Sequence, residues 1–132
     1  MDALAIARAY DRAYDARDVE RMIALAHEDV EAVTPGGTVR GHATLRAFME
    51  RQTYGVSWYA TERRYFCRGG DAVVVSVQGE WRYVDSGDVA EHEHGAAVYS
   101  IHDGLITRFE PFEDLDAALA AAAMTPDDEA VG

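Results

Sequence analysis

Residues 95–112, GAAVYSIHDGLITRFEPF, decide the expected fold, because two runs of β-branched and aromatic residues flank the short break HDG at 102–104. An Asp-Gly pair between such runs is typical of a tight hairpin turn. The stretch therefore predicts two neighbouring antiparallel strands, over residues 89–102 and 105–113.

Two further runs of the same kind precede this hairpin, over residues 57–68 and 72–84, with breaks at RGGD and DSGD. Short breaks between long strands predict an antiparallel meander of four strands. Before residue 53 the apolar residues instead recur at helical spacing. This spacing predicts helices over residues 2–16, 16–30 with Asp18 as N-cap, and 41–52, with a closing helical turn over 117–124.

Helices followed by a meander indicate an α+β protein, in which a strongly curved antiparallel sheet wraps around the N-terminal helices. The cone formed in this way either fills with side chains or holds a ligand in an internal pocket. We expect one domain over residues 1–124 and a flexible acidic tail over 125–132. The expected core residues are Ile6, Leu25, Leu45, Phe48, Val75 and Ile106.

The chain carries 24 acidic and 12 basic side chains, which leaves a formal charge of −12. This charge argues against nucleic acid as a partner, because phosphates repel an acidic surface. The single cysteine, Cys67, has no partner for an intrachain disulfide, which fits a reducing compartment. No apolar run reaches membrane-spanning length and the first residues form no apolar leader, so we expect a cytoplasmic protein with no membrane partner.

Two long segments carry a family resemblance: ARAYDRAYDARDVERMIALAHEDVEAVTPGGTVRGHATLRAFM at residues 7–49 and GAAVYSIHDGLITRFEPFEDLDAAL at residues 95–119. In these segments the chain resembles the SnoaL-like group of the nuclear transport factor 2-like superfamily. The resemblance implies a cone fold, a homodimer and cofactor-free chemistry on a hydrophobic small molecule. The superfamily includes isomerases, cyclases, dehydratases, epoxide hydrolases and non-catalytic binding proteins, so the function must be argued from the site.

Glu110 is the leading candidate for a general base. It shares one face of its predicted strand with Ile106, Arg108 and Phe112, and similarity to ketosteroid isomerase-like and limonene epoxide hydrolase-like members turns this face inward. A carboxylate walled by apolar groups has a raised pKa and can take and return a proton. The alternative is a structural ion pair between Glu110 and Arg108 at the rim of the cavity.

His92 and His94 lie two residues apart in AEHEHG, residues 90–95, and share one face of the predicted strand. The hairpin register brings His94 near Glu110, so we expect His94 to relay a proton and His92 to lie at the mouth of the cavity. Both imidazoles together with Glu110 would supply a set of metal ligands. Paired histidines on an acidic strand are more often solvated or hydrogen-bonded, and we therefore expect no metal site.

Tyr10 holds a position that resembles the oxyanion-hole tyrosine of ketosteroid isomerase, where a phenol donates to a developing oxyanion. The alternative is an aromatic core residue. The chain departs from that enzyme, since Thr34 or a neighbour replaces its catalytic aspartate and Ala96 replaces its second acid. A steroid isomerase mechanism is therefore not supported. The Asp-Arg-Asp set of limonene epoxide hydrolase is not visible either, so the resemblance to that enzyme also falls short.

Aromatic residues and a few polar groups form the expected wall of the cavity. Gly79 interrupts the strand over residues 72–84, and it marks a bulge or makes room for another group. The predicted substrate-binding residues are Thr34, Trp58, Trp81, His92, Arg108 and Phe112.

Two functions therefore remain open. The first is a cofactor-free enzyme of cyclase, isomerase or hydrolase type, in which Glu110 moves a proton, His94 relays it and Tyr10 stabilises negative charge. The second is a non-catalytic module of the same fold that binds a small molecule or forms a dimer. Polar groups on the predicted inward faces favour the enzyme, and the missing family aspartates favour the binding module.

Overall fold

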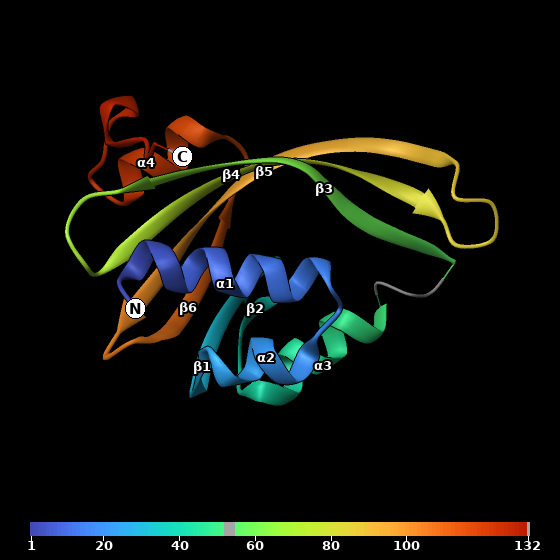
Figure 1. The fold of residues 1–132 in the computed structure, drawn as a ribbon, viewed down its shortest axis with the longest axis horizontal. Coiled ribbons are helices and arrows are strands. Elements are labelled where there is room, and N and C mark those ends of the chain that lie inside the picture. Colours follow the sequence, from blue (N-terminus) through green and yellow to red (C-terminus); the bar gives the residue numbers. More distant parts are fainter. Residues whose placement is uncertain (52–54, 132) are drawn as a thin grey trace.

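The computed structural model describes residues 1–51 and 55–131. Its elements are the helices α1 (Ala3–Asp15), α2 (Val19–Ala24), α3 (His42–Arg51) and α4 (Leu115–Ala121), the strands β1 (Ala26–Thr34), β2 (Gly37–Arg40), β3 (Val56–Cys67), β4 (Ala72–Tyr83), β5 (Val89–His102) and β6 (Leu105–Phe112), and the short 3-10 helix η1 (Pro126–Asp128). Figure 1 shows one curved sheet with α1, α2 and α3 on its concave face and α4 on the opposite face. None of the helices in these described ranges is long and apolar enough to cross a membrane.

The strands lie in the order β2-β1-β6-β5-β4-β3. The predicted antiparallel meander from β3 to β6 is confirmed. The sequence did not predict that β1 would join this meander in parallel, beside β6. Residues 26–30, expected as the end of the second helix, begin β1 instead. Their backbone joins the sheet, since Ala26 pairs with Ile106 of β6, and the carbonyl of Val30 accepts a hydrogen bond from the N–H of Gly41.

Helix α1 begins at an N-cap, where the Asp2 side chain accepts a hydrogen bond of 2.8 Å from the N–H of Ala5. Its apolar stripe faces the sheet and contributes Ile6, Ala7 and Tyr10 to the main core. Burying this stripe stabilises the helix far more than its intrinsic propensity does.

The main core lies between the helices and the concave face of the sheet. The predicted core residues Ile6, Leu25, Leu45, Val75 and Ile106 are all buried there. Phe48 is half-buried and lines a cavity, so its placement in the core was wrong. A second cluster lies under α4 on the convex face and consists of Phe66, Val74, Ala96, Ala118, Leu119 and Met124.

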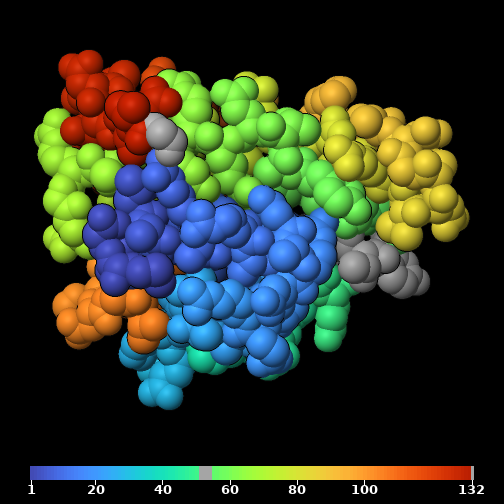
Figure 2. Space-filling view, in the orientation of Figure 1, coloured from blue at the N-terminus to red at the C-terminus, as the bar shows by residue number. Residues whose placement is uncertain are grey.

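Residues 125–131, expected as a flexible acidic tail, lie against β3, and Gly132 is outside the described residues. Figure 2 shows this C-terminal segment, in red, packed beside β3. Glu129 accepts two hydrogen bonds from Arg64, at 2.9 and 2.7 Å, and the N–H of Ala130 donates to the carbonyl of Tyr65 at 2.7 Å. Acidic side chains of this segment therefore form ion pairs with β3. The acidic composition alone did not indicate these contacts.

Candidate functional site

A β-bulge in β6 decides which of its side chains face the helices. Arg108 pairs with Ser100, but Ile106 pairs with Ile101, so Thr107 is an extra residue on β6. A bulge of this kind reverses the alternation of side chains beyond it. Consequently Ile106 and Phe109 both reach the concave core, although they are an odd number of residues apart.

The prediction that Glu110 faces the cavity is therefore wrong. Glu110 pairs with Val98, which packs in the convex cluster under α4, and its side chain is 39% exposed. Its carboxylate lies 3.7 Å from the guanidinium of Arg108, as in the alternative ion-pair hypothesis. His94 pairs with Gln78 on β4 and is not opposite Glu110, because β5 continues beyond the end of β6.

A cavity of about 380 Å³ lies between α1, α3 and the concave face of the sheet. We name it the inner chamber and define it by Tyr10, Asp11, Phe48, Arg63, Tyr99 and Phe109. Its other lining residues are aromatic, aliphatic or proline side chains. Asp11 and Arg63 are thus the only acidic or basic residues among the described residues that line it.

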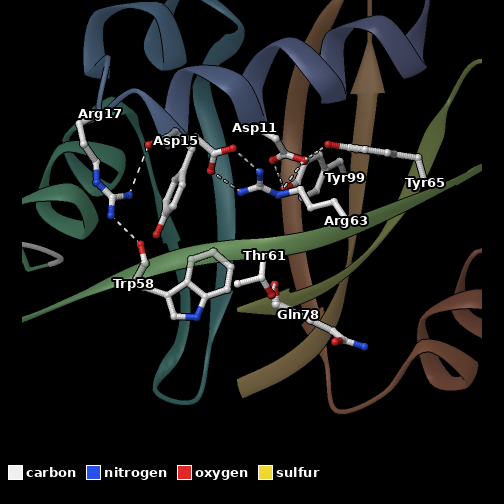
Figure 3. A network of polar contacts seen from close by, with 10 residues as sticks. Asp11, Asp15, Arg17, Trp58, Thr61, Arg63, Tyr65, Gln78 and Tyr99 are labelled. Carbon is white, nitrogen blue, oxygen red and sulfur yellow. Dashed lines mark hydrogen bonds and ion pairs between the residues drawn. The ribbon is translucent and has the colours of Figure 1, made fainter. Parts of the chain in front are cut away.

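Asp11 is held by a polar network that links α1 to two strands (Figure 3). The Asp11 side chain is nearly inaccessible, and its two carboxylate oxygens each accept a hydrogen bond of 2.7 Å, one from Tyr99 and one from Tyr65. Arg63 places its Nε 3.6 Å from the same carboxylate and donates both Nη groups to Asp15, at 2.6 and 2.9 Å. The carboxylate is therefore fully hydrogen-bonded although it is buried.

Burial raises the pKa of Asp11 above its ordinary value, and Arg63 and the two tyrosine hydrogen bonds oppose this rise. A raised pKa makes a carboxylate a stronger base, which suits it to accepting a proton. The sequence argument missed Asp11. The available signal was its position one turn after Ala7, inside the apolar stripe of the predicted helix, where a charged side chain needs buried partners.

Tyr10 lies in the inner chamber, as expected, and is 6% exposed. Its ring packs on Tyr99 and Phe109, with centroids 6.0 and 4.8 Å away. Its hydroxyl has no hydrogen-bond partner among the described residues. Burial, followed by the negative charge of Asp11, raises the pKa of Tyr10. The phenol therefore stays protonated and is available as a donor to a ligand in the chamber.

A second cavity of about 490 Å³ adjoins the first and shares Tyr14, Trp58, Val77, Ala97 and Pro111 with it. We name it the outer chamber. The predicted substrate-binding residues Trp58, Trp81 and Phe112 all line it, and so does His94. Glu93 and Glu113 add two carboxylates, and Glu93 accepts a hydrogen bond from the indole N–H of Trp81.

Gly79 makes room for the indole of Trp58, which lines both chambers. A Cβ atom at position 79 would lie 2.3 Å from Cζ2 of the Trp58 indole. The β3–β4 register also shifts here, between Ala60 and Glu62, so Gly79 marks a bulge as well as making room. Arg17 holds the same segment by donating to Ser57 Oγ at 2.9 Å and to the carbonyl of Trp58.

Residues 6–109 match the family model of the SnoaL-like domain. The chain belongs to the SnoaL-like family. Among proteins of curated function, none matches it. Similar solved structures include a candidate polyketide cyclase from Xanthomonas campestris pv. campestris, with 23% identity, 89% of this chain and 94% of that chain covered and a TM-score of 0.74.

Two other similar solved structures have a higher sequence identity to this chain. A candidate polyketide cyclase from Pseudomonas putida KT2440 is 25% identical, covers 88% of this chain and 94% of its own, and has a TM-score of 0.73. TerC, co-crystallised with polyporic acid, is 28% identical, covers 87% of this chain and 93% of its own, and has a TM-score of 0.64. These similarities agree with the curved sheet and helical cover observed in this SnoaL-like protein.

The remaining predicted residues of the SnoaL-like site line neither chamber. His92 borders a polar groove with Thr61 and Gln78, and its Nδ1 lies 3.9 Å from Glu80. Arg108 lies between Glu31 and Glu110 on the convex side. Thr34 closes the β1–β2 turn, where its hydroxyl donates to the carbonyl of Gly37 at 2.7 Å. Among residues 1–51 and 55–131, no cluster of three acidic, histidine or cysteine side chains is arranged to hold a metal.

Proposed function

We propose that this SnoaL-like protein is a small-molecule enzyme that transfers a proton within an apolar carbonyl compound bound in the inner chamber. The observation that carries this proposal is that one apolar cavity is lined both by a buried carboxylate, Asp11, and by Tyr10, whose hydroxyl has no partner among the described residues. Buried polar groups are costly unless they are used or paired. Cyclisation, isomerisation and dehydration of such compounds all begin with this kind of step.

In the proposed step the carbonyl oxygen accepts a hydrogen bond from Tyr10, and the Asp11 carboxylate takes a proton from the adjacent carbon. The electron pair of the broken C–H bond moves to the carbonyl oxygen, where the Tyr10 phenol stabilises the enolate. The protonated Asp11 then returns the proton to carbon or to a leaving group. Tyr65 and Tyr99 orient the carboxylate throughout.

The structural neighbours support an organic ligand of moderate size. TerC was crystallised with polyporic acid, and its structure covers most of this chain at 28% identity. The candidate polyketide cyclases share the fold. No cofactor enters the proposed step, since both the base and the donor come from the chain itself.

The test uses exchange of carbon-bound protons for deuterium in a panel of apolar ketones dissolved in heavy water. The wild-type protein should accelerate exchange of at least one ketone, and Asp11→Asn should lower that rate by about 10²-fold or more. Tyr10→Phe should lower the rate by about 10²-fold through loss of the donor to the enolate. Asp116→Asn, an exposed change on α4, serves as the control. Equal rates in the wild type and Asp11→Asn would refute the proposal.

The second candidate is a binding module, and one observation favours it. Both oxygens of Asp11 already accept hydrogen bonds, as expected of a group that only ties α1 to the sheet. If the protein only binds a ligand, Asp11→Asn would lower its free energy of unfolding, and neither the wild type nor the variant would accelerate deuterium exchange.

We further propose, from the superfamily resemblance, that two copies form a homodimer in the cytoplasm. A sedimentation mass of one chain at micromolar concentration would contradict the dimer.

A further inference from the structure

The outer chamber combines aromatic rings with carboxylates and has no lysine or arginine among its described lining residues. Tyr14, Trp58 and Trp81 supply the rings, and Glu93 and Glu113 supply the carboxylates. Arg63 is the one arginine or lysine that the described residues bring to either chamber, and it lies in the inner one, whereas His94 lines the outer one. The guanidinium of Arg63 is already paired with Asp15, so it does not neutralise the carboxylates of Glu93 and Glu113 in the outer chamber.

Rings and carboxylates in this combination recognise an organic cation. An ammonium group is attracted to the face of tryptophan or tyrosine rings, and a nearby carboxylate adds a Coulomb attraction. The formal charge of −12 on the whole chain raises the local concentration of cations further. Glu93 and Glu113 would repel an anionic group, and His94 is the only basic side chain among the described lining residues of the outer chamber.

The inner chamber indicates what the rest of the ligand is like. It is mostly apolar, and it contains Tyr10, a residue that is 6% exposed and whose hydroxyl has no partner among the described residues. The two chambers share Tyr14, Trp58 and Val77 in their walls and therefore adjoin. One molecule can thus place an apolar body beside Tyr10 and a charged end beside Trp81.

We propose that the joined chambers bind an amphiphilic organic amine. Its protonated nitrogen lies in the outer chamber among Trp58, Trp81 and the carboxylates of Glu93 and Glu113. Its apolar body carries a hydrogen-bond acceptor to Tyr10 in the inner chamber. This inference names the substrate class of the proposed function, and it rests on the inner chamber being the ligand site.

Three probes of equal length test the charge preference: phenylbutylamine, phenylbutanol and phenylbutyrate. Trp58 and Trp81 are the only two tryptophans of the chain, and both line the outer chamber, so their fluorescence reports binding. The amine should bind about tenfold more tightly than the alcohol, and the butyrate more weakly than the alcohol. Added salt should reduce the advantage of the amine and leave the affinity of the alcohol almost unchanged.

Variants with matched charge changes locate the effect. Glu93→Gln and Glu113→Gln, each made alone, should lower the amine affinity severalfold and leave the alcohol affinity unchanged. Glutamine at position 93 keeps an oxygen acceptor for the Trp81 indole, so the ring retains its hydrogen bond. Glu28→Gln removes an equal charge from an exposed position on β1 outside both chambers and should change neither affinity.

The outcomes separate this inference from the function on which it rests. If the alcohol binds as tightly as the amine, the joined chambers are a ligand site but the preference for amines is wrong. If none of the three probes changes the tryptophan fluorescence or binds by calorimetry, both the amine inference and the proposed ligand site are overturned. Loss of the amine preference in Glu28→Gln would also contradict the inference, because the preference would then follow net charge.

Discussion

The Tyr99 hydroxyl on β5 donates a hydrogen bond of 2.7 Å to the Asp11 carboxylate on α1, across 88 positions of the sequence. Tyr65 on β3 donates to the other oxygen at the same distance. These two bonds attach the helix to two strands that are not neighbours in the sheet. They also hold the carboxylate at the wall of the inner chamber, so stability and the proposed chemistry depend on the same side chain.

Replacing Tyr65 with phenylalanine should lower the free energy of unfolding by about 1–2 kcal/mol, because one Asp11 oxygen would lose its donor. Tyr10→Phe is the matched control, since its hydroxyl has no partner among the described residues, and it should cost less than about 0.5 kcal/mol. Urea unfolding of both variants measures the difference. An equal loss in the two variants would show that the network does not stabilise the fold as described.

Glu110→Gln should leave the deuterium exchange rate of the proposed enzyme unchanged, whereas Asp11→Asn should abolish most of it. The reason is that Glu110 lies on the convex side beside Arg108, and Asp11 lies in the inner chamber. The two variants are compared at equal protein concentration with the same ketone. If Glu110→Gln lost the exchange activity and Asp11→Asn retained it, Glu110 would be the general base, as the sequence predicted.

Gly79→Ala should destabilise the protein by roughly 2 kcal/mol or more, because its Cβ atom would overlap the Trp58 indole and Tyr59 backbone oxygen. Gly95→Ala is the control on the neighbouring strand, where the nearest atom, the Phe112 carbonyl oxygen, is 3.9 Å away. Thermal unfolding gives the stability, and tryptophan emission reports any movement of Trp58. Equal melting temperatures for the two variants would contradict the close packing at position 79.

Acid should release the C-terminal segment from β3 before the rest of the protein unfolds. The Thr125 backbone N–H lowers the pKa of Asp128 from its ordinary 3.8, and the Arg64 hydrogen bond lowers that of Glu129 from 4.5. Because the folded-state values are the lower ones, these carboxylates stabilise docking above their ordinary pKa values and lose this contribution as the pH falls through the lowered values.

Hydrogen exchange at the Ala130 N–H, which bonds to Tyr65, measures this release. Protection should decrease with falling pH in the wild type, after correction for the intrinsic exchange rate. Glu129→Gln should show reduced protection already at neutral pH, and Asp116→Asn should behave like the wild type. Arg68 also lies 3.1 Å from the Asp128 carboxylate. Protection that is independent of pH would show that the Glu129–Arg64 and Asp128–Arg68 ion pairs do not hold the segment.

Much of the fold follows from periodicity and turn chemistry alone. The strands β3 to β6 begin and end within a residue of their predicted bounds, because Gly- and Asp-containing breaks separate long runs of strand-forming residues. Helix α1 was predictable for a similar reason, since its apolar stripe is regular. Of the predicted site residues, Tyr10 and Trp58 line the inner chamber, because each lies on an element whose buried face the local pattern determines.

Only the tertiary structure decided which carboxylate reaches the inner chamber. The extra residue in β6, Thr107, reverses the side-chain alternation between Ile106 and Glu110, and nothing in the local pattern marks it. Asp11 acquires its partners from β3 and β5, at sequence separations of 54 and 88 residues. A sequence determines local periodicity, whereas register and long-range partners depend on how the whole sheet closes over the helices. For this reason the carboxylate that lines the inner chamber is Asp11 and not the predicted Glu110.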